Sequence, residues 1–185
     1  MNGQINAHGS LFFLLKRFIE KQFGESKWKE INERTGTSNR SYDPHENYPA
    51  SELDALIFEA ARSENKSVFE LKEKFGESMV PDLLELYKKY VDPSWKTFEL
   101  LEYTEHVMHK AVRKEESKAS PPVLNVSRVH DKLLIIDYYS ARRMASLAVG
   151  IIKGIAKHYN ESEKIKVIPA SDPNDERVQI RIEFS

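Results

Sequence analysis

Apolar residues in the N-terminal part of the chain recur at spacings of three and four, the period of a helix with one buried face. The first such segment follows Ser10, a residue type that favours a helix N-cap, and it ends at Gly24. A shorter helical segment passes through Trp28 and ends at Gly36. Residues 36–50 are rich in Gly, Ser, Asn, Asp and Pro, so they are predicted to form a loop.

Helix-start signals divide the next stretch into further helices. They are Ser51-x-x-Asp54 and Ser67-x-x-Glu70, which resemble capping boxes, Pro81, which suits a first helical turn, and Ser94, which suits an N-cap. The helix that follows Ser94 is predicted to run unbroken from Trp95 to about Arg113.

After Pro121-Pro122 the spacing of apolar residues changes from that of helices to that of strands. Two segments rich in β-branched residues predict a hairpin that turns at His130 and Asp131, and a strongly amphipathic helix follows it. The last eight residues before the terminal serine alternate strictly between polar and apolar side chains, as a half-buried strand does. The predicted strands are 123–129, 132–139, 164–169 and 177–184, and the predicted helix is 144–159. The pattern therefore predicts an α+β fold, helices first and then a mainly antiparallel sheet with one long helix.

Composition narrows the class of protein. The chain has 185 residues, 28 Lys+Arg against 29 Asp+Glu, and no cysteine. The absence of cysteine excludes a disulfide scaffold, a thiolate metal site and a cysteine nucleophile. The balanced charge argues against a dedicated nucleic-acid binder. The longest apolar run, Leu11–Leu15, is far shorter than the roughly 20 residues that span a bilayer, and the N-terminus lacks the features of a signal peptide, so we expect a cytoplasmic protein without a membrane segment.

Candidate chemistry is sparse. His106 and His109 are three residues apart on a predicted helix, but the sequence places no third ligand beside them, so solvated or partly packed histidines are the simpler interpretation. The segment Tyr138-x-Ser140-x-Arg142 is more informative, because its three polar side chains alternate where a strand gives way to a helix. A phenol, a hydroxyl and a guanidinium converging at a helix start would suit carboxylates or phosphates. An N-cap serine beside a surface arginine is the alternative.

Tyr-x-Ser-x-Arg resembles the haem-propionate signature of the haem-nitric oxide/oxygen-binding (H-NOX) domains. His109 precedes Tyr138 by 29 residues, the family's offset for its haem ligand, and Pro122 follows His109 by 13, the offset of the proline that presses on the haem. The resemblance extends to both ends of the chain. It is carried there by Gly9, Phe23-Gly24, Trp28 and the Gly-Ile-Ile-Lys-Gly run at 150–154.

The resemblance implies one H-NOX domain over residues 1–185. A helical subdomain, about 9–66, would pack on a subdomain of about 67–185 that holds the ligand helix, a mainly antiparallel four-stranded sheet and the signature motif. Haem b would lie between them. His109 would bind the iron, Tyr138, Ser140 and Arg142 would hold the propionates, and Pro122 would contact the macrocycle.

Family members that hold O2 place a tyrosine hydroxyl beside the bound gas. The register puts Leu147 at that position and Leu11, Leu15 and Met79 on the rest of the distal wall. Since none of these side chains donates a hydrogen bond, we expect binding of NO and CO with discrimination against O2. A tyrosine from another helix, Tyr87, Tyr90 or Tyr103, would change this expectation if it reached the pocket.

The resemblance thus implies a haem-based NO sensor and not an enzyme. In the family, NO weakens or breaks the iron–histidine bond, which would free His109 and relax the haem from Pro122. We expect the signal to pass to a separate chain, by analogy a histidine kinase or a cyclic-dinucleotide enzyme. A haem-free module that binds an apolar carboxylate in the same cavity is the alternative. A haem enzyme is a third hypothesis, which the apolar distal wall disfavours.

Overall fold

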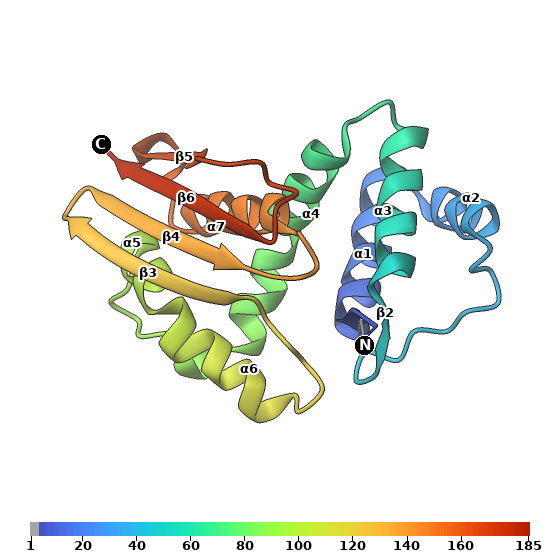
Figure 1. Ribbon diagram of the computed structural model, residues 1–185, viewed down its shortest axis with the longest axis horizontal. Coiled ribbons are helices and arrows are strands. Elements are labelled where there is room, and N and C mark those ends of the chain that lie inside the picture. Colours follow the sequence, from blue (N-terminus) through green and yellow to red (C-terminus); the bar gives the residue numbers. More distant parts are fainter. Residues whose placement is uncertain (1–3) are drawn as a thin grey trace.

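The computed structural model describes residues 4–185. Its N-terminal part is a helical subdomain in which α1 and α3 lie side by side and α2 packs on their outer edge (Figure 1). A short antiparallel pair of strands, β1 and β2, ties the start of α1 to the start of α3. The elements are β1 (Asn6–His8), α1 (Gly9–Phe23), α2 (Glu25–Thr35), β2 (Asn47–Pro49) and α3 (Ala50–Ser63).

The second subdomain begins with the long helix α4 and contains a four-stranded sheet (Figure 1). All neighbouring strands are antiparallel, in the order β3-β4-β6-β5. Val178, Ile180 and Ile182 are fully buried, so the predicted alternation of the last strand is confirmed. The remaining elements are α4 (Val68–Leu86), η1 (Lys88–Tyr90), α5 (Thr97–Tyr103), η2 (Thr104–His109), α6 (Lys110–Glu115), β3 (Val123–His130), β4 (Leu133–Tyr139), α7 (Ala145–His158), η3 (Ser162–Lys164), β5 (Ile165–Pro169) and β6 (Arg177–Phe184).

Helices α4 and α7 form the closest helix pair of the fold. Gly150 of α7 sits directly on the backbone of α4, where an added Cβ would lie 2.0 Å from the carbonyl oxygen of Glu73. Only glycine allows the two backbones to approach this closely. The pair joins two hydrophobic cores, one within the helical subdomain and one between α5, α7 and the sheet.

The α+β fold and the hairpin are confirmed, and so is the Ser67–Glu70 capping box, in which the Ser67 hydroxyl accepts from the Glu70 N–H at 3.1 Å. The other helix starts that the sequence predicts are wrong. Pro81 lies inside the continuous helix α4, and α3 begins after Pro49 without a side-chain cap at Ser51. Helix α1 likewise begins at Gly9 without a side-chain cap, so Ser10 lies in its first turn.

The predicted helix 95–113 is interrupted. It begins only at Thr97, after a turn in which Ser94 bonds Asp92, and residues Thr104–His109 form a π-helix between α5 and α6. The short strands β1 and β2 were not predicted, and β2 falls in the expected loop. No helix within residues 4–185 is long and apolar enough to cross a membrane.

Candidate functional site

A cavity of about 440 Å³ lies between the two hydrophobic cores. Its walls come from α1, α4, α5, the π-helix, β4 and α7, together with the segment 119–122 that precedes β3. Most of the wall is aliphatic, and the polar side chains on it are few. A largely apolar cavity with a few convergent polar groups is the usual form of a cofactor or small-molecule site.

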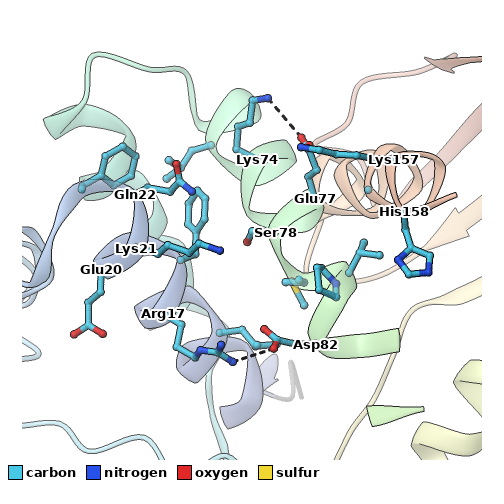
Figure 2. Close-up of a pocket in the computed structure, with 18 of the residues that line it drawn as sticks. Arg17, Glu20, Lys21, Gln22, Lys74, Glu77, Ser78, Asp82, Lys157 and His158 are labelled. Atoms are coloured by element: carbon cyan, nitrogen blue, oxygen red, sulfur yellow. Dashed lines mark hydrogen bonds and ion pairs between the residues drawn. The ribbon is translucent and has the colours of Figure 1, made fainter. Parts of the chain in front are cut away.

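A larger groove of about 870 Å³ runs along the outside of α1, α4 and α7 (Figure 2). Its rim carries ion pairs, including Arg17 with Asp82 at 3.1 Å and Lys157 with Glu77 at 2.8 Å. Of the predicted haem-site residues, the groove contains only Met79. We therefore place the candidate site in the smaller, apolar cavity.

His109, the predicted iron ligand, lines this cavity at the last residue of the π-helix. Its Nδ1 lies 2.9 Å from Oε2 of Glu105, one turn earlier. Burial lowers the pKa of the His109 imidazole, which favours the neutral ring that binds metals. Burial alone would raise the pKa of Glu105, but hydrogen bonds from His109 and Arg113 hold it below its ordinary value, so Glu105 is a carboxylate.

Pro122 also lines the cavity, at the end of the segment that leads from α6 to β3. Its carbonyl accepts a hydrogen bond from Arg113 Nη2 at 3.4 Å. Since Arg113 also bonds Glu105, the segment that carries Pro122 is tied to the turn that carries His109.

The Tyr138-x-Ser140-x-Arg142 motif lies at the end of β4. Tyr138 is buried on the inner face of the sheet, and burial raises its pKa against the opposing effects of the Ser140 hydroxyl and the Arg142 charge. Arg142 donates from Nη1 to the carbonyl of Asn6 at 3.3 Å and from Nη2 to the carbonyl of Ser120. Arg142 thus joins the N-terminal strand to the segment before Pro122.

One part of the motif prediction is wrong. Ser140 does not cap a helix, because its N–H bonds Glu176 O, a turn follows, and α7 starts only after Met144. Tyr138 and Arg142 line the cavity, whereas Ser140 lies beside it. The three side chains therefore gather at a strand end and turn rather than at a helix N-terminus.

Three of the four predicted distal residues, Leu11, Met79 and Leu147, line the cavity. Leu15 is fully buried within the helical core and does not contribute to the cavity wall. The three lining side chains come from α1, α4 and α7, so one wall of the cavity is apolar and is built by both subdomains.

Two further polar side chains on the cavity wall are Tyr87, one of the three tyrosines named as able to reach the pocket, and His8, which the sequence did not single out. Tyr87 is buried, whereas Tyr90 bonds Glu115 at 2.6 Å and Tyr103 stacks on Trp95. Among the described residues the Nε2 of His8 has no hydrogen-bond partner, and the nearest carboxylate oxygen, on Glu116, is 3.9 Å away.

These residues fit a haem. A neutral imidazole such as that of His109 would be a suitable ligand for haem iron, and an arginine beside a tyrosine would suit the propionates. The apolar walls suit the macrocycle. The unpartnered Nε2 of buried His8 marks a further place where a bound group can supply the missing hydrogen bond.

Comparisons with known proteins match the chain over most of its length. A family model described as haem-NO-binding matches residues 8–167. An H-NOX protein from S. oneidensis in its Fe(II)NO state superposes with a TM-score of 0.84 at 23% identity, covering 97% of this chain and 99% of that one. Unliganded Fe(II) H-NOX from K. algicida gives 0.85 at 20% identity, covering 97% of both chains. No curated protein sequence matches the chain.

Proposed function

Because the chain belongs to the haem-NO-binding (H-NOX) family, we propose that it is a haem-based nitric oxide sensor. It would hold ferrous haem b through one histidine, bind NO and CO, discriminate against O2, and pass the signal to a separate protein. The observation that carries the proposal is the placement of His109, Pro122, Tyr138 and Arg142 on one apolar cavity between the two cores.

Each residue would have a distinct task. Haem supplies an iron centre that binds diatomic gases. Glu105 holds the Nδ1 side of His109, so Nε2 is the nitrogen left to face a metal. Arg142 would neutralise and orient the propionates with its planar fork, while the hydroxyls of Tyr138 and Ser140 would fix their geometry. Pro122 would bear on the macrocycle from the segment that Arg113 anchors.

The gas preference follows from the cavity wall. Bound O2 carries negative charge and gains from a hydrogen-bond donor, whereas NO needs a donor far less. Leu11, Met79 and Leu147 give no donor on the wall that they share. Tyr87 and His8 also line the cavity but are not among these three residues, and Nε2 of His8 lies 3.9 Å from a carboxylate oxygen of Glu116. A site without a donor at the gas favours NO and CO over O2.

The path of the signal would start at His109. Its movement would displace Glu105, which also accepts hydrogen bonds from Arg113 in α6 and from the backbone of Leu124 in β3. The ligand turn is therefore coupled to the sheet, and Arg142 couples the same region to the N-terminal strand. We propose that a histidine kinase or a cyclic-dinucleotide enzyme reads the resulting change.

The same cavity would accept an apolar carboxylate, with Arg142 as its anchor. The half-buried Glu105–His109 pair favours haem, since a fatty-acid site does not need an oriented imidazole. The test is titration of the purified protein with haemin, followed by reduction and addition of NO, CO or air. Stoichiometric uptake, NO- and CO-dependent spectra and no stable O2 complex are expected. No haemin uptake, with binding of a fatty acid instead, would overturn the proposal.

A further inference from the structure

The carboxylate of Glu105 is the centre of a half-buried hydrogen-bond network beside the cavity. Its Oε2 lies 2.9 Å from Nδ1 of His109 and accepts from the backbone N–H of Leu124 at 3.0 Å. Its Oε1 accepts from Nη1 of Arg113 at 2.8 Å. The side chains of Glu105 and His109 are only 16% and 15% exposed. Three partners from three elements therefore hold the carboxylate in one position.

This network fixes the proton on His109. A carboxylate that already accepts from an arginine and an amide is an acceptor toward its third partner as well. The hydrogen on the imidazole must then be on Nδ1, and the lone pair on Nε2. A neighbouring carboxylate that accepts from Nδ1 also raises the basicity of the ring as a metal ligand.

The backbone contributes to the same arrangement. Glu105 and His109 both lie in the π-helix, where the Thr104 hydroxyl bonds the Leu100 carbonyl at 2.7 Å. Single π-turns within α-helices are rare and occur frequently at functional sites. Here the π-turn joins α5 to α6 at the residues that form the carboxylate–imidazole pair.

We propose that Glu105 is a positioning residue that orients His109 and sets how readily a gas ligand displaces it from iron. The inference rests on the proposed function. A carboxylate acceptor strengthens the bond from Nε2 to a metal, so Glu105 would oppose the loss of His109 from a bound haem iron. Arg113 shares the carboxylate charge and limits this effect. The pair thus determines the strength of the NO response.

The test compares haem-loaded wild-type protein with Glu105→Gln, which keeps the shape and the acceptor for Leu124 but removes the charge. The readouts are the iron–histidine stretching frequency of the ferrous protein by resonance Raman, and the fraction of protein that has lost His109 after NO. We expect a lower frequency and about tenfold easier loss of His109, at the low end of measured effects for such partners.

Glu102→Gln is the matched control. Glu102 lies in the same helical segment and pairs with Arg128 at 3.3 Å, away from His109. It should leave both readouts unchanged. Arg113→Gln is a second variant, at an exposed side chain. Without Arg113, the Glu105 carboxylate interacts more strongly with His109. We therefore expect a higher iron–histidine frequency and less loss of His109, the opposite of Glu105→Gln.

Equal frequencies and equal loss of His109 in wild type, Glu105→Gln and Arg113→Gln would overturn the inference while leaving a haem sensor in place. Failure of the wild type to take up haem would overturn the proposed function and this inference with it. Should Glu105→Gln fail to fold, Arg113→Gln is the test: a higher iron–histidine frequency supports the inference, and an unchanged or lower one overturns it.

Discussion

Gly76 of α4 lies so close to Leu147 of α7 that a Cβ atom on Gly76 would stand 2.2 Å from the Leu147 carbonyl oxygen. The contact fixes the backbone of the residue whose side chain forms part of the apolar cavity wall. Helix packing and pocket shape are therefore set by the same pair of residues.

Gly76→Ala should destabilise the protein, because the new methyl group must push α7 away from α4. Overpacking of this kind costs about 1–3 kcal/mol of unfolding free energy. Urea unfolding measures the loss. Lys74→Ala, at an exposed position of the same helix, should stay within about 0.5 kcal/mol of wild type. A Gly76→Ala protein as stable as wild type would show that the two backbones do not meet as described.

Arg142→Lys should weaken haem binding by about tenfold, since lysine keeps the charge but loses the planar fork, and a hydrogen bond to a charged group is worth about 1.5–3 kcal/mol. Haemin titration followed by absorbance measures the affinity. The neighbouring Arg143→Lys is the control, because Arg143 pairs with Glu176 at 3.2 Å on the surface. Equal affinities of the two variants would remove Arg142 from the propionate site.

Leu147→Tyr should create a stable O2 complex, because it places a hydroxyl donor on the distal wall. A hydrogen bond to a partly charged acceptor predicts about a tenfold gain in O2 affinity. Absorbance of the reduced protein under graded O2 tests it. Tyr87→Phe in the wild-type background should leave gas binding unchanged. If instead the wild type holds O2 and Tyr87→Phe releases it, Tyr87 is the donor and the proposed selectivity is wrong.

The stability of the protein should fall as the pH drops below about 6.5. Burial lowers the native pKa of His8 below its ordinary 6.5. The unfolded chain therefore takes up the proton first, and folded protein is disfavoured as the pH falls from 6.5 toward the native pKa. His109 contributes in the same direction.

His8→Gln should accordingly lose less stability than wild type between pH 7.5 and pH 5.5, as judged by urea unfolding at both values. His106→Gln, at an exposed position of the π-helix, should retain the wild-type dependence. An unchanged dependence in His8→Gln would show that His8 is not buried as a neutral ring. The surroundings that act on His8, besides its burial, are Glu116, His45, Glu46 and Lys118.

Long periodic segments of the fold could be predicted because their apolar residues recur at the period of a helix or a strand with one buried face. The strand ending in Phe184 and the helix α7 are examples. Local start signals failed where tertiary packing overrode them. Pro81 cannot donate to the carbonyl four residues earlier, yet α4 continues through it because packing against α1 and α7 offsets a cost of about 3 kcal/mol.

Only those residues of the candidate site that belong to the family's motif, or lie at a fixed offset from it, could be predicted from the sequence. His109, Pro122, Tyr138 and Arg142 meet at one cavity, as the resemblance implied. Glu105 was within reach of sequence reasoning, since residues four apart share a helix face. His8 was not, because its place on the wall depends on how the helical subdomain docks on α4 and α6. Tyr87 was named with Tyr90 and Tyr103 as able to reach the pocket, and the structure shows that it is the one that lines the cavity.

The visible absorption spectrum of the dithionite-reduced, haem-loaded protein, before and after NO, compared with that of His109→Gly, tests the central claim most directly. The account predicts a five-coordinate, histidine-ligated ferrous spectrum that changes with NO in the wild type. In His109→Gly that histidine-ligated spectrum should be absent until free imidazole restores it. A His109→Gly protein with the same spectra and coordination as wild type would contradict the account.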